Sequence, residues 1–256
     1  MNALFDQLLT TLIALWWPFC RTLAMFSMAP ILGDNMVPVT IRVLLSAVLA
    51  FVMLPITQGG ALIDPLSLHG VVATLEQVLI GFAIGLAFHL AMSVVTVLGH
   101  LISSQMGLMM AMLNDPMSGA SSDVVSGLLY MLCILVFFAI DGHLVLAGVL
   151  GESFRAWPVG SGIQLLALNL VALNVAWVLS AAVLLALPVV FSALVVQMGF
   201  GFLNRVAPSF NLFSLGFSLV TLFGLLMLAQ IVRLVPDHYI RLTHKVLQML
   251  RQAMGS

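Results

Sequence analysis

The sequence contains few charged residues. Asp, Glu, Lys and Arg make up 7% of its 256 positions, whereas hydrophobic residues make up 62%. A soluble domain carries about 25% charged residues, and a protein this apolar would expose large hydrophobic patches to water and aggregate. The composition therefore predicts a membrane protein. The net charge of −1 supplies no basic surface, so we expect no nucleic-acid partner.

Recognisable catalytic motifs are also missing. The chain has no HExxH, no GxxxxGK(S/T) and no GxSxG. We therefore predict a protein that is not an enzyme, that needs no cofactor, and whose work is powered by other proteins. Cys20 and Cys133 lie in separate apolar segments without metal-ligand spacing, which favours small buried side chains over a disulfide. No Lys or Arg precedes Arg21, which argues against a cleavable signal peptide.

Long apolar runs are what the chain does contain. About 20 apolar residues span a bilayer as a helix. Six segments qualify as candidate spans: Leu8–Leu32, Ile41–Ile56, Val71–Leu98, Val125–Leu150, Leu165–Met198 and Leu212–Val235. Their lengths fit simple crossings badly, since the second is short and the third and fifth need tilt or a kink, which Pro188 supplies in the fifth.

The predicted connections are short and rich in Gly, Pro, Ser, Asn or Asp. They are Gly33–Pro38, Thr57–Gly70, Asp115–Asp123 and Gly151–Gly162. Charged residues then return after Val235, with a spacing that predicts a short amphipathic helix at a membrane surface. The basic residues of this tail favour the cytoplasmic side, although the short loops carry few basic residues to compare.

A stripe of small and polar residues runs along the third segment. Gln77, Gly81, Gly85, His89 and Ser93 are spaced four apart and share one helix face. Small residues let two helix backbones approach closely. Packing within the chain and contact with another subunit both explain the stripe, and His89 is better read as a hydrogen-bonded interior residue than as a proton carrier.

A Met-rich segment precedes the predicted loop at Asp115–Asp123. Methionine is flexible and polarizable, so it fills irregular gaps and can repack. A deformable seal across a pore and loose core packing explain this composition equally well. The candidate seal residues are Gln105, Met106, Met109, Met110, Met112, Asn114, Asp115, Pro116 and Met117.

Ionisable residues in the apolar runs allow a second reading. Asp141-Gly142-His143 could form a proton relay, but the central glycine and the turn preference of Asp favour a structural bend. Arg21, Arg42 and Glu76 stand near segment ends, where their side chains can reach the interface.

A charged corner divides the last two segments. Nothing between Ala156 and Asn204 is charged, and then Arg205 and Pro208 predict a turn between two helices. The second helix of this hairpin carries a polar seam beside a row of phenylalanines, which predicts a partner along that face. The seam is Asn211, Ser214, Ser218 and Thr221, and the aromatic row is Phe210, Phe213 and Phe217.

Four groups of residues together resemble the FliR family of flagellar export-gate proteins and their injectisome counterparts, SctT. The groups are Arg21 with Ala29-Pro30-Ile31 and Val37-Pro38; Gln105-Met-Gly-Leu with Asp115-Pro116; Asp141-Gly-His143 with Ser153-Phe154 and Pro158-Val-Gly160; and Leu203-Asn-Arg-Val-Ala-Pro208 with Phe213 and Gly216-Phe217. The chain departs from the family pattern at Ser218, where a proline is frequent, and at Thr40 and Ile41, where lysine is common.

The resemblance implies an all-α membrane protein of kinked helical hairpins, with a FliP-like part over 1–162 and a FliQ-like hairpin over 163–256. It implies an inner-membrane export gate of the flagellar basal body, built with FliP and FliQ, through which unfolded flagellar proteins pass. Membrane lipid and components of the FlhB type (FliB-like) and FlhA type are further expected partners.

The family also implies roles for residues. The Gln105–Asp123 region matches a plug loop in the pore, and Arg205, Pro208, Asn211, Ser214 and Phe217 become candidate subunit contacts together with Gly81, Gly85 and His89. The alternative function is a stand-alone secondary transporter that uses Glu76, His89 or Asp141.

Overall fold

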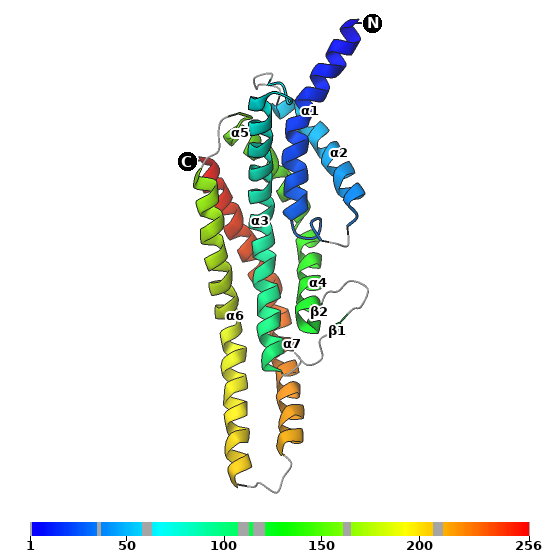
Figure 1. Ribbon diagram of the computed structural model, residues 1–256. Helices are drawn as coiled ribbons and strands as arrows, with labels where there is room; N and C mark the ends of the chain where they lie inside the picture. Colours follow the sequence, from blue (N-terminus) through cyan, green and yellow to red (C-terminus); the bar gives the residue numbers. More distant parts are fainter. Residues whose placement is uncertain are drawn as a thin grey trace. The chain divides into compact units, whose positions relative to one another are not determined.

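A computed structural model describes residues 2–34, 37–57, 63–106, 113–114, 121–160, 165–206 and 212–255. These residues are helical apart from one pair of two-residue strands and short turns (Figure 1). The elements are α1 (Asn2–Met28), α2 (Val39–Thr57), α3 (Leu68–Gln105), β1 (Leu113–Asn114), β2 (Ser121–Ser122), α4 (Val124–Ala139), α5 (Gly142–Ala156), α6 (Leu165–Val206) and α7 (Leu212–Gly255). The predicted all-helical class is confirmed.

The helices supply five to six candidate membrane spans within the described residues. Five are single helices, and α4 with α5 makes a sixth if this bent pair crosses as one span. The six predicted apolar segments thus all correspond to candidate spans. Membrane crossings of this kind are helical because a bilayer offers no water to satisfy free backbone groups.

The chain forms two compact units that interleave along the sequence. Unit 1 contains residues 1–90, 137–175 and 243–256, and unit 2 contains residues 91–136 and 176–242. This division differs from the predicted boundary at 162/163, which concerns likeness to FliP and FliQ and stays a prediction. The long helices α3, α6 and α7 each pass from one unit into the other.

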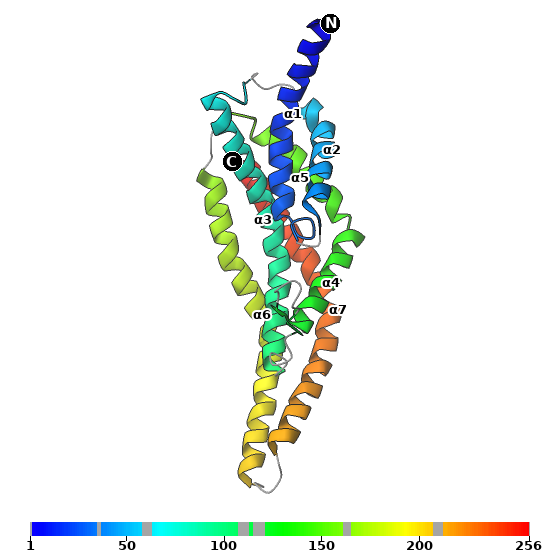
Figure 2. The same ribbon diagram turned by 45° about the vertical axis from the view of Figure 1, so that its right-hand side comes forward.

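In unit 1, α2 packs beside α1 and also against α5 (Figures 1 and 2). The core between these helices is made of small and apolar side chains such as Met25, Ala29, Ala50 and Leu150, all fully buried. Pro18 lies inside α1 and does not end the helix. One turn further along, the Thr22 hydroxyl donates to the Pro18 carbonyl over 2.6 Å.

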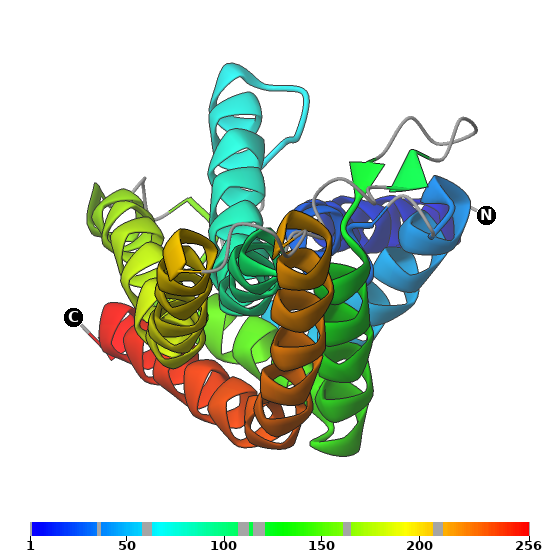
Figure 3. The ribbon, with the colours of Figure 1, turned by 90° about the horizontal axis from the view of Figure 1, so that it is seen from below.

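In unit 2, α6 and α7 run antiparallel, as the predicted hairpin requires (Figures 1 and 2). The second half of α3 stands beside α7, and β1 and β2 pair next to the first turn of α4 (Figure 3). The strands are antiparallel, with Leu113 opposite Ser122 and Asn114 opposite Ser121.

Two predicted boundaries are wrong. The loop expected at Gly151–Gly162 starts later, because α5 continues to Ala156 and the described turn covers only 157–160. The charged tail is helical as predicted, but it is the end of the long helix α7 and not a separate short one. Its buried side chains, Tyr239, Leu242, Val246 and Ala253, recur every three to seven residues, so the tail is amphipathic.

Candidate functional site

The Met-rich segment follows the end of α3. Gln105 is the last residue of α3, Met106 lies in the turn after it, and Asn114 belongs to β1. The remaining candidate seal residues lie outside the described residues: Met109, Met110, Met112, Asp115, Pro116 and Met117. Of this segment the structure describes Gln105, Met106 and the backbone of β1.

Met106 ties the start of the segment to α7. Its side chain is buried, and its carbonyl oxygen accepts a hydrogen bond from Oγ1 of Thr221 over 3.2 Å. Gly224, one turn further along α7, leaves the space that the Met106 side chain occupies: a Cβ there would lie 3.1 Å from the Met106 sulfur. Thr221 of the polar seam of α7 thus binds inside the chain.

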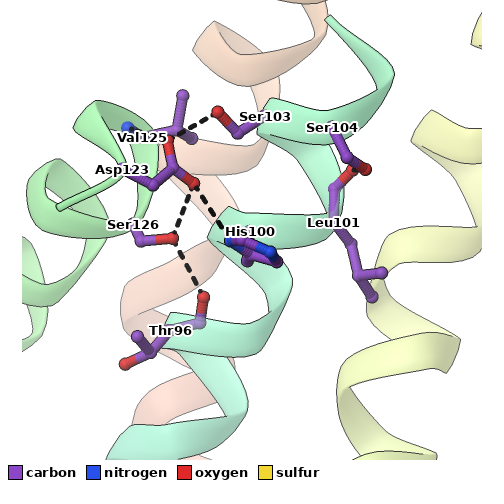
Figure 4. Close-up of polar contacts among 8 residues, drawn as sticks. All are labelled: Thr96, His100, Leu101, Ser103, Ser104, Asp123, Val125 and Ser126. Atoms are coloured by element: carbon purple, nitrogen blue, oxygen red, sulfur yellow. Dashed lines mark hydrogen bonds and ion pairs between the residues drawn. The ribbon is translucent and has the colours of Figure 1, made fainter. Parts of the chain in front are cut away.

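Asp123, the last residue of the predicted loop after the segment, binds back to α3 (Figure 4). Ser103 of α3 donates to its Oδ1 over 2.5 Å, and the Val125 backbone N–H donates to the same oxygen over 3.1 Å. Ser126 donates to Oδ2 over 2.9 Å. Because Asp123 precedes α4, its carboxylate also satisfies a free amide and the positive end of that helix.

The helices α3 and α4 touch one turn away from Asp123. A Cβ on Gly99 would come within 2.6 Å of the Ser126 Cα, so only glycine permits this approach. The Ser126 hydroxyl also lies 3.1 Å from the Thr96 carbonyl oxygen (Figure 4). Thr96, Gly99 and Ser103 share one face of α3, so we name these three with Asp123 and Ser126 the α3–α4 clasp.

A second polar centre lies in unit 1 around Arg21, which is fully buried. Its Nε donates to Gln77 Oε1 over 2.8 Å, Nη1 donates to Ser153 Oγ over 3.0 Å, and Nη2 donates to the Trp157 carbonyl over 2.8 Å. The three partners come from α3, from α5 and from the residue that ends α5. One guanidinium therefore joins α1 to two other helices.

The surroundings of Arg21 offset the free-energy cost of burying its charge. The guanidinium carbon lies 4.0 Å from the centre of the Phe154 ring, a cation–π contact. The buried carboxylate of Glu76 attracts it electrostatically, and the Trp157 carbonyl belongs to the negative end of α5. The prediction that Arg21 and Glu76 reach the membrane interface is wrong, since both are buried among helices of the same chain.

The glycine stripe of α3 packs within unit 1. A Cβ on Gly81 would collide with the Arg21 carbonyl oxygen, and one on Gly85 would collide with that of Met25. α1 therefore covers both glycines, which is the packing within the chain that the sequence left open. His89 on the same stripe is half-buried and has an interaction partner.

Asp141-Gly142-His143 forms a bend, as favoured from the sequence. Asp141 adopts a left-handed backbone conformation with φ 53° and ψ 35°, and α4 and α5 are bent by 67° at this break. The Asp141 carbonyl accepts the Leu144 and Val145 amides at the start of α5. The side chains of Asp141 and His143 are exposed, so the buried relay receives no support.

The corner between α6 and α7 follows the predicted hairpin. α6 ends at Val206 and α7 begins at Leu212, and Arg205 is exposed in the last turn of α6. Pro208 and Asn211 lie outside the described residues, and for Ser214 and Phe217 the structure describes the helical backbone of α7 alone. Their role as subunit contacts stays a prediction.

Sequence reasoning missed several residues that shape these sites. Gln77, Ser153 and Phe154 were noticed in motifs but were not assigned to Arg21. A buried arginine in an apolar helix must find polar partners, so isolated polar residues in the other apolar helices were a usable signal. Ser103, Gly99 and Gly224 were missed outright, and Asp123 was named only as the end of a predicted loop, since no local pattern shows which turns of two helices meet.

These helices, with a Met-rich segment rooted between α3 and α4, define a polytopic all-helical membrane protein. The chain belongs to the family described as bacterial export proteins, family 1, whose model matches residues 12–246. This membership agrees with the prediction of a non-enzymatic transport component, and it favours an export protein over a stand-alone transporter.

Curated relatives cover almost all of the chain. The flagellar biosynthetic protein FliR of Pectobacterium carotovorum subsp. carotovorum is 31% identical over 92% of this chain and 90% of its own. The FliR of Escherichia coli (strain K12) is 30% identical over 96% of this chain and 94% of its own. The FliR of Bacillus subtilis (strain 168) is 24% identical over 100% of this chain and 99% of its own.

Proposed function

We propose that this protein is a subunit of the flagellar type III protein export gate in the bacterial inner membrane. The membership of nearly the whole chain in a bacterial export family carries this proposal. The relatives that cover both chains almost end to end are flagellar biosynthetic proteins, which favours the flagellar apparatus over an injectisome.

The partners follow from the same proposal. FliP and FliQ form the gate with this chain, with 1–162 taking a FliP-like and 163–256 a FliQ-like place in the assembly. Many large apolar side chains of α2 and α6 are exposed in the isolated chain, such as Phe51, Phe191 and Phe202. Lipid and sister subunits would cover them. FlhB-type and FlhA-type components and unfolded flagellar proteins complete the list of partners.

Within the gate, the Met106–Met117 segment closes the pore. Its attachment supports this role, because Met106 is fixed to α7, β1 inside the segment pairs with β2 beyond it, and Asp123 binds Ser103 across the whole stretch. A short segment held at both ends can be displaced by a passing chain and return. Flexible methionine side chains can seal around varied surfaces.

The conductance of the purified gate tests the proposal. The chain is co-expressed with FliP and FliQ, and the complex is reconstituted in planar bilayers. Asp substitutions at Met109 and Met110 should raise the ion conductance of the resting complex, whereas Leu substitutions, which conserve volume, should not. Normal assembly with unchanged conductance in the Asp variants would remove the plug role. A chain that purifies alone and binds a small solute would instead support the transporter.

A further inference from the structure

We propose that Asp123 is a positioning residue that holds together the two ends of the stretch 104–122, which contains the Met-rich segment. This inference rests on the proposed plug function. Asp123 lies directly before α4, yet its carboxylate also binds Ser103 near the end of α3. The two residues are 20 positions apart, and the segment lies between them.

Closing a chain of this length has an entropic cost that grows with the logarithm of its length, so its ends separate unless something holds them. The Asp123 side chain is 8% exposed, which protects its hydrogen bonds from competition by water. Ser103 Oγ and Val125 N–H converge on one carboxylate oxygen, and Ser126 Oγ reaches the other. The carboxylate thereby joins α3 to α4 at the root of the segment.

The available hydroxyl hydrogens determine which contacts between α3 and α4 depend on Asp123. Ser126 has a single hydroxyl hydrogen and two acceptors within reach, the Asp123 carboxylate and the Thr96 carbonyl. Without the carboxylate, Ser126 keeps the Thr96 carbonyl, and the close approach at Gly99 also remains. Ser103 loses its bond to α4. Removal of Asp123 should therefore open the root of the segment and leave the crossing of α3 and α4 packed.

His100, on the same face of α3, adds less to the stability of the clasp than Ser103 does. Its Nδ1 lies 3.8 Å from Asp123 Oδ2, and its side chain is 48% exposed. A long contact with one exposed partner adds little, and this one is an ion pair only if the imidazole is protonated. His100→Gln should consequently leave the clasp intact, which separates an effect of the Ser103–Asp123 bond from a general effect of charge.

The experiment compares Asp123→Ala with Asp64→Ala in the co-purified complex. Asp64 is a matched control, because its Oδ1 accepts the Leu66 amide two residues on, as Asp123 accepts that of Val125, but its contact stays within one loop. Hydrogen exchange of the peptide that covers β1 and β2 reports whether the root is closed. Exchange should rise about tenfold in Asp123→Ala, as expected for a lost hydrogen bond to a charged group, and stay unchanged in Asp64→Ala.

The conductance of the same samples tests the positioning role of Asp123 separately from the plug function of the Met-rich segment. If the Met109 and Met110 charge variants leak but Asp123→Ala shows neither faster exchange nor leak, the positioning role is overturned. If Asp123→Ala exchanges faster while the Met variants do not leak, the clasp holds and the plug function fails. Should Asp123→Ala not assemble, Ser103→Ala removes the same bond with a smaller change, and normal exchange in that variant overturns the proposal.

Discussion

The Nε of Arg21 donates a hydrogen bond of 2.8 Å to Oε1 of Gln77, and both side chains are fully buried. This bond joins the last third of α1 to α3 and is one of three that the guanidinium makes, each to a different residue. It also fixes the orientation of the Gln77 amide, since the oxygen must face the donor.

Replacing Arg21 should damage folding of unit 1. Arg21→Leu leaves Gln77, Ser153 and the Trp157 carbonyl without their donor and Glu76 without its countercharge, so we expect a loss of about 3–5 kcal/mol in stability. Arg21→Lys should recover little, because an ammonium cannot span the three partners of a planar guanidinium. Thermal denaturation of the detergent-solubilised complex measures both.

Arg251→Ala is the control for Arg21. Arg251 pairs with Glu152 at 3.6 Å, but their side chains are 66% and 46% exposed, so its loss should cost at most about 1 kcal/mol. Equal melting temperatures for Arg21→Leu and Arg251→Ala would refute the bracing role of the buried arginine.

Gly81→Ala should separate α1 from α3. The added methyl group meets a backbone carbonyl, which cannot move aside as a side chain can, and overpacking of this kind costs about 1–3 kcal/mol. Gly148→Ala is the matched change in α5: among the described residues nothing lies within 4 Å of its Cβ, and the helix gains up to about 1 kcal/mol. A melting temperature that is unchanged or raised in Gly81→Ala would contradict the close packing.

Asp141 variants distinguish a bend from a proton relay. Asn tolerates the left-handed conformation and cannot carry a proton, so Asp141→Asn should retain stability and export. Asp141→Val should lose about 1–2 kcal/mol because a β-branched residue resists positive φ. Loss of flagellar export in a stably assembled Asp141→Asn complex would restore the relay.

Arg205→Leu tests the corner between α6 and α7. Because Arg205 is exposed in the isolated chain, its removal should leave folding intact and reduce the yield of complex with FliP and FliQ. Co-purification yield and the amount of membrane-inserted chain are measured together. A normal yield would leave this corner as a plain turn without a subunit contact.

Local patterns in the sequence were sufficient to predict the helices and the bend at residues 141–142. The apolar runs became helical, and the Asp-Gly pair at 141–142 became a bend that divides one run into α4 and α5, because both features follow from the preferences of neighbouring residues. The expectation that α5 would give way to a loop at Gly151 failed. Gly151 is buried inside α5 and faces α2, where a Cβ on it would lie 3.6 Å from the Met53 sulfur, an ordinary van der Waals contact. Tertiary burial outweighed the weak helix propensity of glycine at this position.

The amino-acid sequence by itself determined that this protein is apolar, helical and built from membrane-spanning lengths, and the order of its motifs pointed to an export family. The tertiary structure alone decided the partners of Arg21, which lie 56, 132 and 136 positions away along the chain. It also decided that Asp123 binds back to α3. Helix periodicity fixes which residues share a face, but packing decides which faces meet and at which turn.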